Sequence, residues 1–183
     1  MKTFQELQEG VYDPNILKAF FLAGGPGSGK SYVIERGTGG LGMKIVNSDD
    51  IFEKYIDDAG MTWKMQSKLG KEQEADRDKL RDRAKEVASK QQANYVEGRL
   101  GLIIDGTGKD YDSITRKAQK LRLLGYDIHM IFVNTSLDIA LKRNAERKRT
   151  LRPDIATKSW KSVQGNMGKF SQFFRQGFIL VDN

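Results

Sequence analysis

The run GGPGSGKS, residues 24–31, constrains this chain more than any other feature of its sequence. A short apolar stretch, residues 18–23, precedes the run, and a helix-prone stretch begins at Lys30. Glycines allow a backbone whose successive N–H groups converge on phosphate oxygens, and a following helix adds the positive end of its dipole. The run fits G-x-x-x-x-G-K-[ST] between a strand and a helix, which predicts a phosphate-binding P-loop rather than an ordinary Gly-rich turn.

In a loop of this kind the triphosphate of a nucleotide is held from several sides. Backbone N–H groups bind phosphate oxygens, Lys30 would neutralise the β- and γ-phosphates, and Ser31 would be a ligand of Mg²⁺. ATP and Mg²⁺ are therefore the expected cofactors. The predicted nucleotide-binding residues are Gly25, Pro26, Gly27, Ser28, Gly29, Lys30 and Ser31.

Short apolar runs alternate with helix-prone stretches along the whole chain. Continuous apolar runs are typical of parallel strands that are buried on both faces of a sheet. We therefore predict an α/β fold, a P-loop NTPase three-layer sandwich with a five-stranded parallel sheet and helices on both faces, and ligands at the carboxyl ends of the strands. The expected strands are residues 18–23, 44–47, 102–105, 129–133 and 178–181.

The length of 183 residues suits one domain. Residues 1–16 are predicted to form an N-terminal arm, and residues 17–183 the P-loop domain. Within that domain, a highly charged stretch at about 62–98 reads as a helical insertion, and a basic stretch at about 143–153 as a lid.

Composition narrows the classes of function. The chain has no cysteine and a single histidine, His129, which excludes disulfides, thiolate metal sites and His-rich metal clusters. No apolar run is long enough to span a membrane and no signal peptide is visible, so we expect a cytoplasmic protein without a membrane partner. The 31 basic residues against 24 acidic ones give a net charge of +7, which favours polyanionic partners.

Three aspartates stand where expected strands end. Asp49 and Asp50 follow the second strand, where a carboxylate would face the nucleotide and accept a proton from an acceptor hydroxyl. We assign Asp49 as the base and Asp50 to the start of the next helix, although either could be the helix N-cap. Asp105 ends the third strand, as a Walker-B aspartate does, and is a candidate Mg²⁺ group, the alternative being the turn pair Asp105-Gly106.

The stretch RNAERKRTLRP is rich in arginine. Arg143 and Arg147 are four residues apart, so a continuous helix would place both on one face. Guanidinium groups on a lid can stabilise the charge that spreads over a transferring phosphoryl group. We therefore predict catalytic roles for Arg143 and Arg147, against the simpler reading of a solvated basic face.

Taken together, four segments resemble the polynucleotide kinase and zeta-toxin branch of the small P-loop kinases. These are GGPGSGKS, NSDDIF, IIDGTGKD and LKRNAERKR. The resemblance implies a catalytic aspartate at Asp49 and lid arginines at Arg143 and Arg147, and the closing F-x-L-V-D-N is more similar to zeta toxins. Where the phage kinase carries a phosphate-binding arginine shortly after the aspartates, this chain has Phe52.

The expected function is an ATP-dependent transfer of the γ-phosphate to a hydroxyl of a nucleotide-containing substrate. A polynucleotide 5′-hydroxyl kinase is the first expectation, because the chain is basic. One alternative is a zeta-toxin-like kinase of a nucleotide sugar of the UDP-N-acetylglucosamine type. A P-loop NTPase or nucleotide-binding switch without an acceptor is the other. The sequence leaves open whether an antitoxin partner exists.

Overall fold

The computed structural model describes residues 16–38, 42–61, 71–147 and 150–183. The predicted arm lies outside the described residues except for Ile16, and so do residues 62–70 of the predicted insertion. The elements follow in the order β1 (Lys18–Ala23), α1 (Lys30–Thr38), β2 (Lys44–Val46), α2 (Ser48–Asp58), α3 (Lys71–Glu97), β3 (Leu102–Ile104), α4 (Tyr111–Leu123), β4 (Asp127–Asn134), α5 (Leu137–Glu146), α6 (Pro153–Phe174), the 3₁₀ turn η2 (Arg175–Gly177) and β5 (Phe178–Asp182).

All five strands form one parallel sheet in the order β2-β3-β1-β4-β5, which confirms the predicted fold. The central strands are mostly apolar and buried, as is typical of parallel strands covered on both faces. In the register, Phe21 of β1 lies beside Ile104 of β3. The P-loop and Asp105 therefore leave the sheet side by side at its carboxyl edge.

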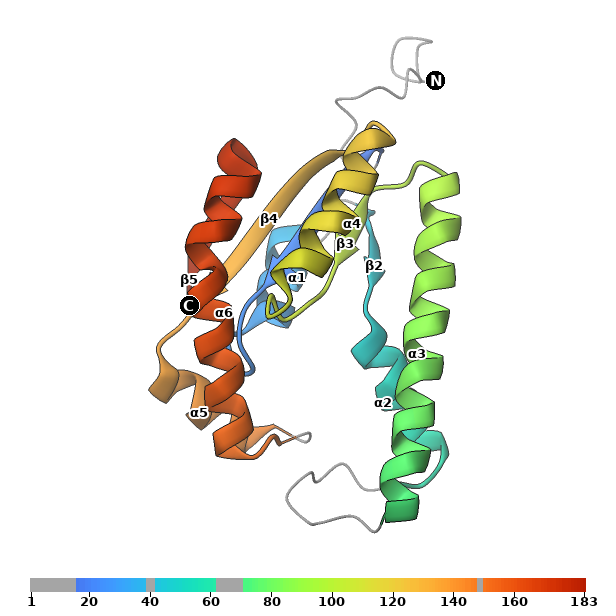
Figure 1. Ribbon diagram of the computed structural model, residues 1–183, viewed down its shortest axis with the longest axis vertical. Helices are drawn as coiled ribbons and strands as arrows, with labels where there is room; N and C mark the ends of the chain where they lie inside the picture. The colour runs from blue at the N-terminus through green and yellow to red at the C-terminus, as the bar shows by residue number, and fades with distance from the viewer. Residues whose placement is uncertain (1–15, 39–41, 62–70, 148–149) are drawn as a thin grey trace.

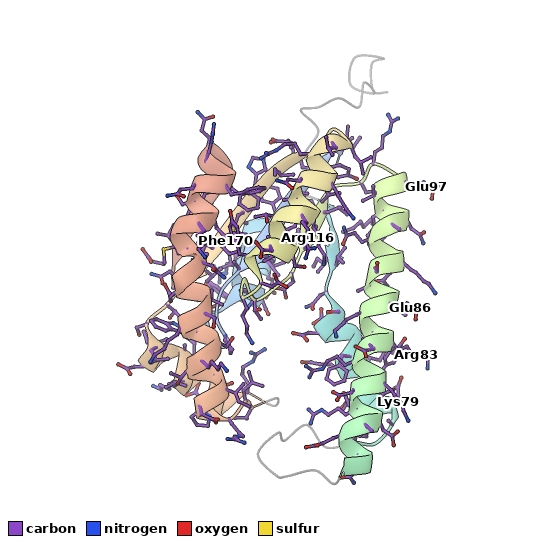
Figure 2. The ribbon with its side chains drawn as sticks, in the orientation of Figure 1. Lys79, Arg83, Glu86, Glu97, Arg116 and Phe170 are labelled. Atoms are coloured by element: carbon purple, nitrogen blue, oxygen red, sulfur yellow. The ribbon has the colours of Figure 1, made fainter. Side chains whose placement is uncertain are left out.

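Helices cover both faces of the sheet, and Figure 1 shows α4 and α6 in front of it and α1 behind. Successive strand residues point to opposite faces, so Phe21 enters the larger core under α3, α4 and α6, whereas Leu22 enters the smaller core beside α1. Figure 2 shows Phe170 on the side of α6 that faces α4, where its ring lies 5.2 Å from that of Tyr111. Each such buried aromatic contributes about 1.5–3 kcal/mol to the fold.

Two helix ends differ from the sequence-based expectation, and both differences matter for the site. Helix α2 begins at Ser48 rather than Asp50, because the side chain of Asn47 caps it by accepting a hydrogen bond from the Asp49 amide. Helix α5 ends at Glu146, and Arg147 already has an extended backbone, with φ −78° and ψ 147°.

Candidate active site

The P-loop connects β1 to α1 through two glycines with a backbone that L-residues rarely adopt. Gly27 has φ 78° and Gly29 has φ 90°. A Cβ atom on Gly27 would also collide with the carbonyl oxygen of Ala140 in α5, so the loop and α5 are in direct backbone contact. At the start of the loop, the Gly24 amide donates to the Thr107 carbonyl at 3.1 Å, which ties the loop to the segment after β3.

Lys30 is the first residue of α1, and its side chain turns back over the loop. Its Nζ donates a 2.9 Å hydrogen bond to the Gly24 carbonyl. Burial lowers the pKa of the Lys30 ammonium, Asp105 and Asp49 oppose this effect, and Arg147 adds to it. A partly buried cation that interacts with two carboxylates and lies over the backbone amides of the loop is suited to a polyanionic ligand.

Asp105 follows β3 directly and is half-buried. The Asn47 side-chain amide donates to Asp105 Oδ2 at 3.1 Å, while Oδ1 is buried without a hydrogen-bond partner. Burial raises the pKa of Asp105, and the charge of Lys30 opposes this only in part. Burial therefore outweighs the attraction between the two groups on both sides of the pair.

These oxygen donors fit the Mg²⁺ that the sequence predicts. The orphaned Asp105 oxygen lies in the same cleft as Ser31, and Mg²⁺ prefers oxygen ligands. Over the described ranges there is no group of three or more acidic or histidine side chains that could hold a metal alone. One carboxylate and one hydroxyl therefore suit a cation that also coordinates the phosphates of a nucleotide.

Asp49 and Asp50 occupy the first turn of α2, and neither is its N-cap. The cap is Asn47, which thus holds both the helix start and Asp105. Burial raises the pKa of Asp50, and the neighbouring charges of Glu53 and Asp49 add to the effect.

A single cleft of about 440 Å³ collects most of the predicted site residues. Pro26, Lys30 and Ser31 line it from the P-loop, and Asp49, Asp105 and Arg147 line it from three other segments. The remaining loop residues contribute backbone rather than a side-chain lining: Gly25 packs on Trp160, Ser28 is buried, and Gly27 and Gly29 make the turns.

Arg143 does not line the cleft together with Arg147. Its Nη1 is buried and lies 3.5 Å from the position that a Cβ of Gly29 would take, on the side where the Asn183 side chain donates to the Ser28 carbonyl. The side chains of Arg143 and Arg147 lie in different places because α5 ends at Glu146, between the two residues. One guanidinium is therefore placed against the P-loop backbone and the other in the cleft.

The segment after α5 is held by a buried asparagine that the sequence analysis did not single out. Asn144 is 2% exposed, donates to the Leu151 carbonyl at 2.8 Å and accepts from the Leu151 amide at 3.2 Å. This pair of bonds fixes the return of the chain towards α6. Asn47 immediately follows the apolar pair Ile45 and Val46, which is a signal that sequence reasoning could have used, whereas the charged surroundings of Asn144 give no such signal.

A second cavity of about 420 Å³ lies between α3 and α4. Ser48 and Asp105 line both cavities, so the two are adjacent. Its lining combines the buried apolar residues Val46, Ala88, Ile104 and Leu121 with the lysines Lys85, Lys117 and Lys120. Lys85 is also paired with Asp82 at 2.9 Å.

With this fold and site, the chain belongs to the AAA domain family, whose model matches residues 20–169. It has the α/β fold of P-loop NTPases, with a kinase-like arrangement of sheet and loop. No curated protein matches it in sequence. No helix in the described part of the chain has the length and apolarity required to cross a membrane.

Several solved structures share the fold at low sequence identity. A chain of the PezAT toxin–antitoxin system of Streptococcus pneumoniae is 16% identical with a TM-score of 0.63, and the match covers 91% of this chain and 68% of that one. A chain of the Pnkp1/Rnl/Hen1 RNA repair complex is 19% identical with a TM-score of 0.60, covering 85% and 46%. A gluconokinase from Sinorhizobium meliloti is 13% identical with a TM-score of 0.52, covering 92% and 83%. This chain thus spans less than half of the RNA repair protein.

Proposed function

We propose that this protein is an ATP- and Mg²⁺-dependent kinase that phosphorylates a hydroxyl group of a nucleotide-containing acceptor. The observation that carries the proposal is the shared cleft, where Lys30, Asp49 and Arg147 arrive from three separate segments. An NTPase that transfers phosphate only to water needs no positioned carboxylate for an alcohol, and Asp49 supplies one.

Each group has a defined part in the transfer. Loop amides and Lys30 hold the triphosphate, and Ser31 and Asp105 would hold Mg²⁺, which neutralises phosphate charge when bound. The oxygen of the acceptor hydroxyl bonds to the γ-phosphorus, and Asp49 accepts the proton of that hydroxyl. The bond from the γ-phosphorus to the β–γ bridging oxygen breaks, ADP leaves, and Arg147 stabilises the spreading charge.

A polynucleotide 5′-hydroxyl end is the acceptor that we propose first. The second cavity supports this choice, because it adjoins the cleft and its lining combines apolar residues with Lys85, Lys117 and Lys120. Bases can pack on apolar side chains while lysines neutralise backbone phosphates. The net charge of +7 and the fold shared with the RNA repair chain are consistent with it.

A nucleotide sugar is the second candidate acceptor. It is supported by the fold shared with the PezAT chain and by the closing F-x-L-V-D-N, which resembles that of zeta toxins. The two candidates differ in where the new phosphate is attached, which a labelling experiment resolves.

The test offers γ-labelled ATP together with 5′-hydroxyl DNA, 5′-hydroxyl RNA or UDP-N-acetylglucosamine. Label on the oligonucleotide supports the first acceptor, and label on the sugar supports the second. If labelled phosphate is released only to water, and no acceptor becomes labelled or changes the rate of release, the kinase proposal is contradicted. Asp49→Asn serves as the negative control, since it should retain nucleotide binding.

A further inference from the structure

An arginine on α3 lines the active-site cleft without any role in the scheme above. Arg81 is half-buried, and its guanidinium carbon lies 4.9 Å from the centre of the Phe52 ring on α2. Phe52 is 1% exposed and belongs to the core between α2 and α3, so the ring is a fixed platform. Arg77, one turn earlier on α3, stacks near the same ring at 6.0 Å.

The stack holds the Arg81 side chain but satisfies none of its N–H groups. Its Nε is buried without a hydrogen-bond partner, and the described residues provide no ion pair or hydrogen bond to the side chain. An arginine stays charged at any physiological pH, so it cannot relieve this cost by losing a proton. A buried charged donor without an acceptor is costly, and an incoming anion would remove that cost.

Arg81 lies on the side of the cleft that carries Asp49, where the acceptor hydroxyl would bind in the proposed mechanism. Phe52 lies three residues after Asp49, so the stacked guanidinium belongs to the same side of α2 as the proposed base. Lys30 belongs to the P-loop and Arg147 interacts with it electrostatically, so both belong to the nucleotide side of the cleft in the proposed mechanism. Asp50 and Glu53 line the cleft together with Arg81.

We infer that Arg81 binds a phosphate group of the acceptor, close to the hydroxyl that receives the γ-phosphoryl. This inference rests on the proposed kinase function and narrows the acceptor to molecules that already carry a phosphate. The guanidinium fork presents paired N–H groups that match two phosphate oxygens. The phosphate is either the first phosphodiester of a polynucleotide or the diphosphate of a nucleotide sugar.

The test compares two acceptors that differ only in that phosphate, thymidine and thymidine 3′-phosphate, both with a free 5′-hydroxyl. In the native enzyme, KM for thymidine 3′-phosphate should be about 10- to 100-fold lower than for thymidine. Arg81→Gln should abolish this preference while kcat changes little, and Arg81→Lys should retain part of it. A preference that persists in Arg81→Gln would overturn the inference.

The matched control is Arg83→Gln. Arg83 lies two residues further along α3 and also stacks on an aromatic ring, that of Tyr55 at 5.1 Å, but it does not line the cleft. Figure 2 labels it on the exposed length of α3 between Lys79 and Glu86. This variant should retain the full preference, which separates loss of the anion site from general damage to α3.

Equilibrium binding keeps this inference separate from the kinase proposal. Titration of thymidine 3′-phosphate or UDP-N-acetylglucosamine into protein that holds a non-hydrolysable ATP analogue requires no transfer. Weaker binding of the first probe to Arg81→Gln points to a polynucleotide, and weaker binding of the second to a nucleotide sugar. Equal affinity of both probes for Arg81→Gln and the native protein, with ATP-analogue binding intact, would refute the role of Arg81 even if the enzyme is a kinase.

Discussion

The ammonium of Lys30 and the carbonyl of Gly24 are joined by a 2.9 Å hydrogen bond that closes the P-loop on itself. Gly24 directly follows β1, and Lys30 is the first residue of α1. The bond therefore holds the lysine side chain over the loop rather than in solvent. Asp105 and Asp49 lie close enough to favour its charged form. The loop is thus organised around one buried positive charge.

Lys30→Ala should weaken the binding of an ATP analogue by about 30-fold or more, because truncating one partner of a buried charged hydrogen bond costs about 2–5 kcal/mol. Isothermal titration calorimetry on folded protein with magnesium measures this. Lys142→Ala, which removes an exposed lysine of α5, should bind as the native protein does. Equal affinity of the Lys30 variant and the native protein would remove the lysine from nucleotide binding.

Asp49→Asn should lower kcat for phosphoryl transfer by a factor on the order of 10²–10⁴, the usual contribution of a general base. The amide retains the size of the carboxylate, and the cap from Asn47 uses only the Asp49 backbone amide, so helix α2 should stay intact. Single-turnover transfer measures the loss, and ATP-analogue affinity is the internal control. Transfer at the native rate would show that another group takes the proton.

Arg147→Ala and Arg143→Ala should have different kinetic consequences, because only Arg147 lines the cleft. Loss of Arg147 should reduce kcat by about 10³-fold, in the range of arginines that stabilise phosphoryl transfer. Loss of Arg143 should act mainly on ATP affinity, since its guanidinium packs against the loop at Gly29. A shared fall in kcat, without a change in ATP affinity for Arg143→Ala, would show that both act on the transition state.

Asn144→Ala should destabilise the protein by about 1–3 kcal/mol, because it leaves the Leu151 amide and carbonyl without their side-chain partner. Urea unfolding at equilibrium measures the change. Asn94→Ala, which truncates an exposed asparagine of α3, is the control and should stay within about 0.5 kcal/mol of the native protein. Transfer by Asn144→Ala should also slow, since the bonds to Leu151 hold the segment that follows Arg147.

The pH dependence of ATP binding should reveal the pairing of Lys30 with Asp105. Burial lowers the pKa of Lys30, so its charge and the affinity for ATP should be lost, as pH rises, at a lower pH than for an exposed lysine. Asp105 is the largest influence that opposes this shift, and Asp105→Asn should therefore move the alkaline loss of affinity to still lower pH.

Titrations without metal, from neutral to strongly alkaline pH, isolate this effect from Mg²⁺ binding. Asp50→Asn is the matched control, because Asp50 does not contribute to the shift of Lys30. An alkaline limb that stays in place in Asp105→Asn would show that the two groups do not interact.

The fold and the centre of the site could be predicted because they depend on local patterns. Apolar runs define the strands, and the glycines with Lys30 and Ser31 define the loop. The separation of Arg143 from Arg147 could not be predicted, since spacing by four implies one face only while the helix continues, and α5 ends at Glu146. Arg81 could not be predicted either, because its position depends on how α3 packs against Phe52.

The contact between Gly27 and the Ala140 carbonyl has a mechanical consequence. No room is left for even a methyl group between Gly27 and the Ala140 carbonyl, so α5 cannot move closer to the P-loop without displacing it. In the proposed mechanism, a movement of α5 towards the loop would displace the amides that bind the triphosphate and also Arg147, which directly follows the helix. Binding of the triphosphate and the position of Arg147 would therefore change together.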